Sequence, residues 1–377
     1  MKLAVLMNSY SLWSRDVARR LAASGLEVLV LDLQAREKGG YLPHDSEMHQ
    51  AGIADLRGSV AGIHTLHSRF HGPLRFASGA RQLRQVLKAW RADALLTLYG
   101  GGYSTTALLS GFRPYTVFLV GSDVHLLGYG GKLVTRLALR RASDILANGK
   151  SLAAAAQRKL TNRPVTSLYI GVDTAKFSPK SRSSTPLRIV CTRGFEAIYN
   201  NMYLIEALGL LPVTSREIEV VFVSSGSQLE EAKSRAATLL GNRDNLRVRF
   251  LGGADESTVV NTLRDAHIYV STSRSDGTSI SLMEALACGV FPVLSDIPAN
   301  AEWIDRAVEN GLLVPLDDPP SLASALTRAI DDEGLRSRAE AYNRAQILRR
   351  ADANTMALEL RSRLEQVSHR HRTESSN

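Results

Sequence analysis

The 377-residue sequence is poor in cysteine and contains no long apolar run. Its two cysteines, Cys191 and Cys288, lie far apart in apolar surroundings, without a CxxC pair or a Cys/His cluster. We therefore expect no disulfide and no zinc site. No segment reaches the roughly 18 apolar residues of a membrane-spanning helix, and the start MKLAVLMNSY turns polar too early for a secretory signal. These absences predict a cytoplasmic protein.

The charge of the sequence is unevenly distributed. Residues 1–180 contain 24 basic and 11 acidic residues, a net +13, whereas the remainder contains 22 and 26, a net −4. A basic half fits a nucleic acid, an anionic membrane surface or an acidic substrate, and composition does not choose among them. The overall composition, 44% hydrophobic and 22% charged, is that of a globular protein and argues against disordered, collagen-like and coiled-coil classes.

Two basic segments, residues 69–91 and 132–141, have the pattern of helices with one basic and one apolar face. Each is either a solvated helix over a core or a surface that contacts anionic lipid at the inner face of a membrane. Neither segment has a helix-turn-helix or RNP-like pattern. Nucleic acid therefore ranks last among the partners.

Short apolar runs alternate with amphipathic segments along the whole chain, as in KLAVLM, EVLVLDL, ALLTLY and YTVFLV. The polar stretch SPKSRSSTP, residues 178–186, has the composition of a linker, and the alternation resumes with LRIVC, EIEVVFVSS and HIYVSTS. This pattern predicts an α/β protein with two doubly wound, Rossmann-like parallel sheets. We assign the domains to residues 1–180 and 181–345. Residues 346–377 form a C-terminal helix that can pack on the first domain, with a disordered end, HRHRTESSN.

Residues 273–304, SRSDGTSISLMEALACGVFPVLSDIPANAEWI, carry the strongest local signals. Asp276 and Gly277 form a turn after a strand, Thr278 or Ser279 caps a helix to about Ala287, and Gly289 ends it. The free N–H groups of such a helix start suit a diphosphate, although a plain strand-to-helix connection has the same pattern.

Glu284 lies in this helix, within ISLMEALACG. A carboxylate on an otherwise apolar helix is either a functional acid or a buried residue satisfied by the backbone. We favour a functional acid that acts together with Asp276, because both can point toward the carboxyl edge of the sheet.

Three segments together resemble the retaining glycosyltransferases of family 4, the glycosyl transferases group 1. They are SDGTSISLMEALACGVFPVLSDIPANAEWI, the NGLLVP of residues 310–315 and the LYIGVDTAKFSP of residues 168–179. In that family a Glu, seven residues and a second Glu precede a pattern like EAMACGxPVV; here the two positions are Asp276 and Glu284. The resemblance implies a GT-B fold, with its two domains facing a cleft, and transfer of a sugar from a nucleotide diphosphate sugar.

The resemblance also implies roles for individual residues. Asp276 would hold the transferred sugar, Glu284 the ribose, and Arg193 the diphosphate, although Arg193 taken alone is an ordinary strand-end residue. The remaining expected donor contacts are Gly277, Thr278, Ser279, Ile280, Tyr199 and Asn200. The donor would be UDP- or GDP-linked. No Asp-x-Asp motif is present, so we expect neither a metal nor a further cofactor.

The sequence departs from the family in three places. Tyr199 and Asn200 stand where a Lys is common, Val120 stands where a His is common, and MNSYSLWSRD replaces a glycine-rich loop. One positive charge is therefore missing, unless a Lys or Arg arrives from elsewhere or Tyr199 donates a weaker bond. Candidates for catalysis or for the acceptor side in the first domain are Asp123, His125, Ser9 and Tyr10.

The acceptor hydroxyl is not specified by any motif. The basic first half and the family resemblance favour a sugar or a lipid-linked acceptor, in cell-surface polysaccharide or glycolipid assembly. Two other functions fit the same scaffold: a nucleotide-sugar epimerase or phosphorylase, and a non-catalytic protein that binds a sugar nucleotide.

Overall fold

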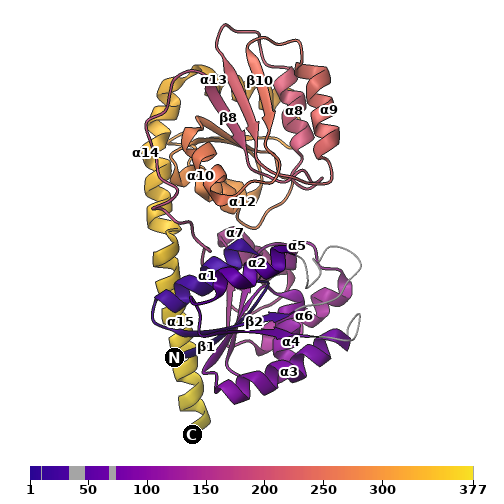
Figure 1. Cartoon of the computed structure of the whole chain (residues 1–377), viewed down its shortest axis with the longest axis vertical. Coiled ribbons are helices and arrows are strands. Elements are labelled where there is room, and N and C mark those ends of the chain that lie inside the picture. The colour runs from indigo at the N-terminus through magenta and orange to yellow at the C-terminus, as the bar shows by residue number, and fades with distance from the viewer. Residues whose placement is uncertain (10, 34–46, 68–73, 377) are drawn as a thin grey trace. The chain divides into compact units, whose positions relative to one another are not determined.

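The computed structural model describes residues 1–9, 11–33, 47–67 and 74–376. The chain divides into two compact units, and each is described by itself (Figure 1). The first unit contains Met1–Ile170 and Ala353–Asn377, and the second contains Gly171–Asp352.

Within the described residues, the first unit is built on a seven-stranded parallel sheet with the order β3-β2-β1-β4-β5-β6-β7. The strands are β1 (Lys2–Met7), β2 (Glu27–Leu33), β3 (Gly62–Leu66), β4 (Ala94–Leu98), β5 (Tyr115–Leu119), β6 (Asp144–Ala147) and β7 (Thr166–Ser167). The helices are α1 (Leu12–Ala23), α2 (Glu47–Leu56), α3 (Leu74–Trp90), α4 (Gly101–Ser110), α5 (Ser122–His125), α6 (Tyr129–Arg141), α7 (Lys150–Lys159) and α15 (Ala353–Ser376).

The second unit repeats this plan with a six-stranded parallel sheet in the order β10-β9-β8-β11-β12-β13. Its strands are β8 (Leu187–Cys191), β9 (Ile218–Phe222), β10 (Leu246–Phe250), β11 (Ile268–Ser271), β12 (Phe291–Ser295) and β13 (Leu312–Val314). Its helices are α8 (Asn201–Gly209), α9 (Leu229–Leu240), α10 (Glu256–Asp265), α11 (Ile280–Ala287), α12 (Pro298–Ala301), α13 (Pro319–Asp331) and α14 (Glu333–Arg350).

Central strands in both sheets are buried along their whole length, which explains their near-continuous apolar sequences. The two predicted doubly wound parallel sheets are confirmed. Strand order reverses between β1 and β4 in the first sheet and between β8 and β11 in the second. Ligands of such sheets bind beyond the carboxyl ends of the strands at this reversal, so a ligand of the second unit is expected at the loops after β8 and β11.

The boundary between the units lies at Ile170 and Gly171, before the predicted boundary at residue 180. The intervening segment packs on the second unit through long-range contacts. Arg344 on α14 donates to the backbone oxygens of Phe177 at 2.6 Å and Thr174 at 2.8 Å. The segment that follows β7 therefore belongs to the second unit.

The C-terminal helix α15 packs against α1 and belongs to the first unit. It continues to Ser376, where the sequence predicted a disordered end. Ser368 donates to the backbone oxygen of Asp93 at 3.4 Å, and Arg372 pairs with the Asp93 carboxylate, so the last turns are attached to the sheet.

Both cysteines are buried free thiols. Among the described residues, no helix is both long enough and apolar enough to cross a bilayer.

Candidate functional site

The helix start after β11 has the predicted geometry. Ser279 is the N-cap of α11, and its hydroxyl accepts a hydrogen bond from the backbone N–H of Leu282 at 3.2 Å. The backbone N–H groups of Ile280 and Ser281 donate no hydrogen bond to any described residue. Two polarised donors are therefore available at the positive end of a helix beside a central strand. The helix ends as predicted, with Gly289 at a φ of +72° just beyond its last turn.

Arg193, on the loop after β8, is brought to this helix start. Its guanidinium donates to the Ser279 hydroxyl at 2.8 Å and to Asp276 Oδ2 at 2.6 Å. The guanidinium also lies over the ring of Tyr199, 4.2 Å from the centroid. The side chains of Arg193 and Asp276 are only 10% and 17% exposed, so the ion pair is shielded from water.

This grouping follows from the reversal of strand order. Because β8 and β11 are neighbours, the loops that follow them lie side by side. Thr272 donates to the backbone oxygens of Tyr199 at 3.1 Å and Asn200 at 3.0 Å, and the Arg274 backbone N–H donates to Ile198 at 2.9 Å. The two loops are thereby held in one arrangement, and four predicted residues, Arg193, Tyr199, Asp276 and Ser279, meet at one place.

Two opposing effects act on the charge of Arg193. The Asp276 carboxylate raises the pKa of Arg193, against the effect of burial, which favours the neutral form. The Nε atom of Arg193 is buried and has no hydrogen-bond partner among the described residues. A buried cation with an unused donor beside free helix N–H groups is suited to an anionic ligand.

The remaining predicted donor contacts have diverse surroundings. Gly277 is buried, and its N–H donates to Asp276 Oδ1 at 2.9 Å; Thr278 is 5% exposed, and Ile280 begins α11. Asn200 has a left-handed backbone (φ 54°) at the start of α8, and its amide donates to Asp317 at 3.1 Å. Within the described residues, the Asn200 side chain has no hydrogen bond to Arg193, Asp276 or Ser279.

Glu284 is partly buried on α11, between fully buried apolar residues. Burial raises its pKa to about 7, and Glu256 adds to the effect, while Arg193 lowers it. The Glu284 carboxylate has no hydrogen bond or ion pair with any described residue, whereas Glu256 pairs with Lys176 at 2.8 Å. Backbone satisfaction, the structural alternative for Glu284, is therefore not observed in the described part of the chain.

Asp123 does not have the surroundings of a catalytic residue. It is completely buried and accepts backbone hydrogen bonds from Gly100 at 2.7 Å, Gly121 at 2.8 Å and Val120 at 3.1 Å. Burial raises its pKa, and these hydrogen bonds oppose the rise. Asp123 holds together the chain ends after β4 and β5, so its predicted role becomes that of a positioning residue.

The other first-unit candidates differ in exposure. Ser9 is fully buried, and its hydroxyl donates to Asp32 Oδ2 at 3.1 Å, so it joins β1 to β2 and faces no solvent. His125 is half-buried, with its Nδ1 atom 3.4 Å from the Lys159 ammonium. Tyr10 lies outside the described residues.

Arg274 was missed by the sequence analysis. Its guanidinium donates to the Asn200 side-chain oxygen at 3.3 Å and to Asp317 at 2.5 Å, and about half of the side chain is exposed. It thus supplies a cation beside the position where the family pattern has a Lys. Its position two residues before Asp276 was a sequence signal that it lies near the predicted site. Its contact with Asn200 could be found only from the pairing of the two loops.

Known proteins resemble this chain in sequence and in fold. Residues 173–346 match the family described as glycosyl transferases group 1. A phosphatidyl-myo-inositol mannosyltransferase from Mycolicibacterium smegmatis is 31% identical over 36% of this chain and 33% of its own length. The lipopolysaccharide core biosynthesis glycosyltransferase LpsE of Rhizobium meliloti is 26% identical over 71% of this chain and 72% of its own length. The first of these matches therefore spans only a third of the relative.

Solved structures match over nearly the whole chain. HepE of Anabaena, in complex with UDP, has a TM-score of 0.77 at 17% identity, covering 97% of this chain and 100% of its own. Sucrose-phosphate synthase from Thermosynechococcus elongatus has a TM-score of 0.77 at 15% identity, covering 97% and 98%. These likenesses show the fold, which is GT-B. Residues 173–346 are thus similar to the glycosyl transferases group 1 family.

Proposed function

We propose that this protein is a retaining glycosyltransferase, which moves a sugar from a nucleotide diphosphate sugar to an acceptor hydroxyl in polysaccharide or glycolipid assembly. The observation that carries the proposal is the meeting of Arg193, Asp276 and the start of α11. Two relatives support the proposal: one is named as a phosphatidyl-myo-inositol mannosyltransferase, and the other as a lipopolysaccharide core biosynthesis glycosyltransferase.

In this proposal the donor diphosphate binds at the start of α11. The N–H groups of Ile280 and Ser281 donate to its oxygens, and Arg193 balances its charge. Asp276 keeps Arg193 in place through one carboxylate oxygen while the carboxylate retains lone pairs that accept hydroxyls of the transferred sugar. Glu284, which has no protein partner among the described residues, accepts the ribose hydroxyls.

Arg274 supplies the second cation. Its guanidinium is half exposed and bound to Asn200 and Asp317, so it can exchange these contacts for a phosphate oxygen at modest cost. The Lys that the family usually carries at the position of Tyr199 and Asn200 is thereby replaced by an Arg from the neighbouring loop.

The chemical step needs positioning and fixed positive charge. The bond between the anomeric carbon and the diphosphate oxygen breaks, and the acceptor oxygen bonds to the same face of that carbon. The acceptor proton passes to the departing diphosphate. The negative charge that develops on this leaving group is stabilised by Arg193, Arg274 and the α11 N–H groups, without a metal or other cofactor.

The test begins with a thermal-shift panel of UDP- and GDP-linked sugars on the full chain. A ligand at 100 times its dissociation constant adds about 2.7 kcal/mol to the free energy of unfolding. The donor so identified is then offered to lipid-linked and sugar acceptors. We expect sugar transfer with retained anomeric configuration, abolished in Glu284→Gln. Nucleotide binding without transfer to any acceptor would favour the non-catalytic alternative, and release of an isomerised sugar nucleotide without acceptor would favour an epimerase.

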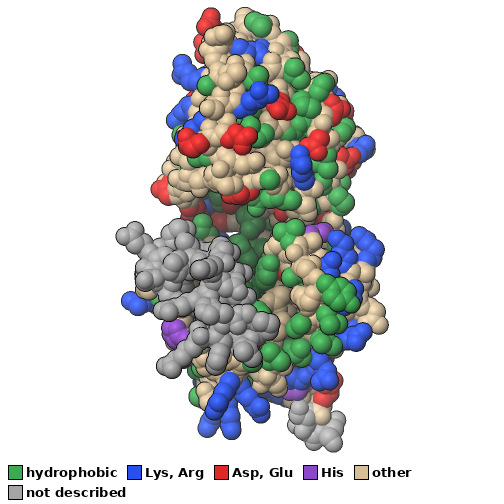
Figure 2. Space-filling view, turned by 90° about the vertical axis from the view of Figure 1, so that its right-hand side faces the viewer, with side chains coloured by type: hydrophobic (Ala, Val, Ile, Leu, Met, Phe, Trp, Pro, Cys, Tyr) green, Lys and Arg blue, Asp and Glu red, His purple; other side chains and the backbone are tan. Residues whose placement is uncertain are grey.

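We also propose that the first unit contacts an anionic membrane surface through α5 and α6. Leu126, at the end of α5, is 68% exposed. Three further apolar side chains, spaced four residues apart on α6 and therefore on one side of that helix, are each at least 44% exposed: Tyr129, Leu133 and Leu137. Lys132, Arg136 and Arg140 lie on the same helix. Hydrophobic and basic side chains lie side by side on the face of the first unit shown in Figure 2.

The membrane proposal is tested by sedimentation with vesicles containing anionic lipid at low salt. We expect binding that weakens with added salt and is reduced in Leu133→Glu. The matched control is Leu358→Glu, because Leu358 is 57% exposed on α15 of the same unit. An equal loss of vesicle binding in both variants would contradict the membrane proposal. So would a failure of the unaltered protein to sediment with the vesicles.

A further inference from the structure

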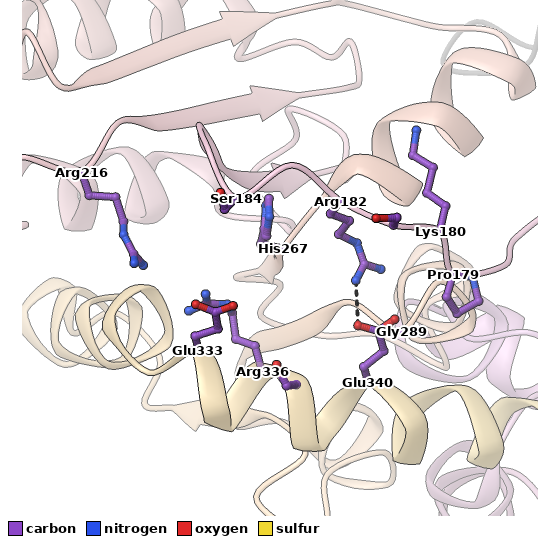
Figure 3. Close-up of a pocket in the computed structure, with 12 residues that line it drawn as sticks. Pro179, Lys180, Arg182, Ser184, Arg216, His267, Gly289, Glu333, Arg336 and Glu340 are labelled. Carbon is purple, nitrogen blue, oxygen red and sulfur yellow. Dashed lines mark hydrogen bonds and ion pairs between the residues drawn. The ribbon is translucent and has the colours of Figure 1, made fainter.

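The second unit contains a cavity that the proposed donor site does not use. It has a volume of about 520 Å³ and lies at the amino ends of the strands, the edge opposite to Arg193. Its walls come from residues 179–184 before β8, Arg216 before β9, His267 before β11 and the first turns of α14 (Figure 3). A volume within the range of about 300–1,000 Å³ accommodates a small-molecule ligand.

Two of the cationic side chains in the wall are already paired. Arg182 donates to the Glu340 carboxylate at 3.0 Å, the contact drawn as a dashed line in Figure 3. Lys180 pairs with Asp265 at 2.5 Å. These two cations are therefore neutralised by the protein and contribute little net charge to the cavity.

Arg216 and Arg336 are different, because neither forms an ion pair with any described residue. Both guanidinium groups donate to the same carbonyl, that of Ile330 near the end of α13, at 2.5 and 2.9 Å. Arg336 also donates to Ala329 at 2.6 Å. One carbonyl thus holds two like charges close together, and the negative end of α13 and the nearby Glu333 offset them only in part.

The electrostatic consequences reach the neighbouring groups. Burial and the proximity of Arg216 lower the pKa of Arg336, although Glu333, Asp332 and Asp331 oppose the change. The His267 ring lies between Arg216 and Arg182 in Figure 3, and burial and nearby arginines lower its pKa to about 4. His267 is therefore neutral near pH 7. Arg216 and Arg336 carry two positive charges against the single negative charge of Glu333, which also lines the wall, so a positive surplus remains.

The carbonyls at the end of α13 use only part of the hydrogen-bond donors of Arg216 and Arg336. A guanidinium has five N–H donors, and the Ile330 and Ala329 carbonyls engage a single terminal nitrogen of each arginine. The remaining donors of both groups are available to the cavity, where the planar forks match the oxygens of a phosphate.

We propose that this cavity binds a small phosphorylated molecule, whose phosphate bridges Arg216 and Arg336. The proposed ligand is of the size of a sugar phosphate or a nucleotide, and its site is separate from the proposed donor site. Since the wall includes residues 179–184, the bound molecule would join the first segment of the second unit to α14.

The test is calorimetric titration of the full chain in phosphate-free buffer with three probes: inorganic phosphate, a hexose phosphate and a nucleoside monophosphate. The variants are Arg216→Gln, Arg336→Gln and Arg336→Lys. The matched control is Arg247→Gln, because Arg247 is an exposed arginine on β10 without an ion pair among the described residues. Arg216 is itself exposed, so its replacement leaves the core of the unit unaltered.

We expect at least one probe to bind, with about tenfold or greater weakening in Arg216→Gln and Arg336→Gln and little change in Arg247→Gln. Arg336→Lys, which keeps the charge and loses the fork, should lie between. Equal weakening in Arg247→Gln, unchanged affinity in Arg216→Gln, or no binding of any probe would overturn the proposal.

Arg193→Gln distinguishes this site from the donor site. Phosphate binding that survives in Arg193→Gln supports a separate cavity site, even if no sugar transfer is ever found. Binding that is lost in Arg193→Gln and kept in Arg216→Gln places the phosphate at α11 and overturns the cavity proposal without affecting the proposed donor site.

Discussion

Replacement of Glu284 by Gln should stabilise the second unit at alkaline pH. The pKa of Glu284 is raised to about 7 in the folded chain from its ordinary value of 4.5, mainly by burial. Each unit of pKa difference corresponds to about 1.4 kcal/mol, so the ionised carboxylate destabilises the fold by about 3 kcal/mol. Gln has the same shape and no charge to desolvate.

The sign of the pH dependence follows from linkage. Because the folded pKa lies above the unfolded value, the contribution of Glu284 is fully present below pH 4.5 and is lost as pH rises through about 7. The difference between Glu284→Gln and the unaltered protein should be near zero at pH 4.5. It should approach about 3 kcal/mol at pH 8.

The assay is urea unfolding at several pH values, followed by the fluorescence of Trp303, which is 1% exposed in the second unit. Trp13 and Trp90 are replaced by Phe in every variant so that only this unit reports. Glu217→Gln is the control, because Glu217 is exposed and its side chain has no partner among the described residues. A Glu284→Gln protein no more stable than Glu217→Gln at pH 8 would refute the reasoning.

Three further results are expected. The affinity for a nucleotide diphosphate sugar should rise as the pH rises through about 7, because the ribose hydroxyls bind the ionised Glu284. An affinity that does not change with pH in calorimetry would contradict the proposed contact between Glu284 and the ribose. Ser279→Ala should lower the free energy of unfolding by about 1–2 kcal/mol, since both the α11 cap and an Arg193 contact are lost, and Ser227→Ala is the exposed control. Asp123→Ala should cost about 3 kcal/mol, because three buried N–H groups lose their acceptor; unchanged urea unfolding would contradict its positioning role.

Local sequence signals predicted local structure well. Ser279 and Gly289 have distinctive capping chemistry, so both ends of α11 could be predicted within a residue. The alternation of apolar runs with amphipathic segments was sufficient to predict two parallel sheets, because the buried strands of such sheets have a continuous apolar sequence.

Long-range contacts could not be predicted in the same way. Arg193 and Asp276 are 83 residues apart, and only the family resemblance connected them before the strand order was known. The unit boundary depends on Arg344 binding the Phe177 carbonyl, 167 residues away. The surroundings of Asp123 could not be predicted, because a buried aspartate that accepts backbone hydrogen bonds and a catalytic aspartate look alike in sequence.

The most direct test of the central claim is a crystal structure of the protein soaked with UDP or GDP. We expect the diphosphate oxygens about 3 Å from the backbone nitrogens of Ile280 and Ser281 and from the guanidinium of Arg193, with the ribose on Glu284. A well-occupied nucleotide bound elsewhere, with Arg193 still paired only to Asp276 and Ser279, would contradict it.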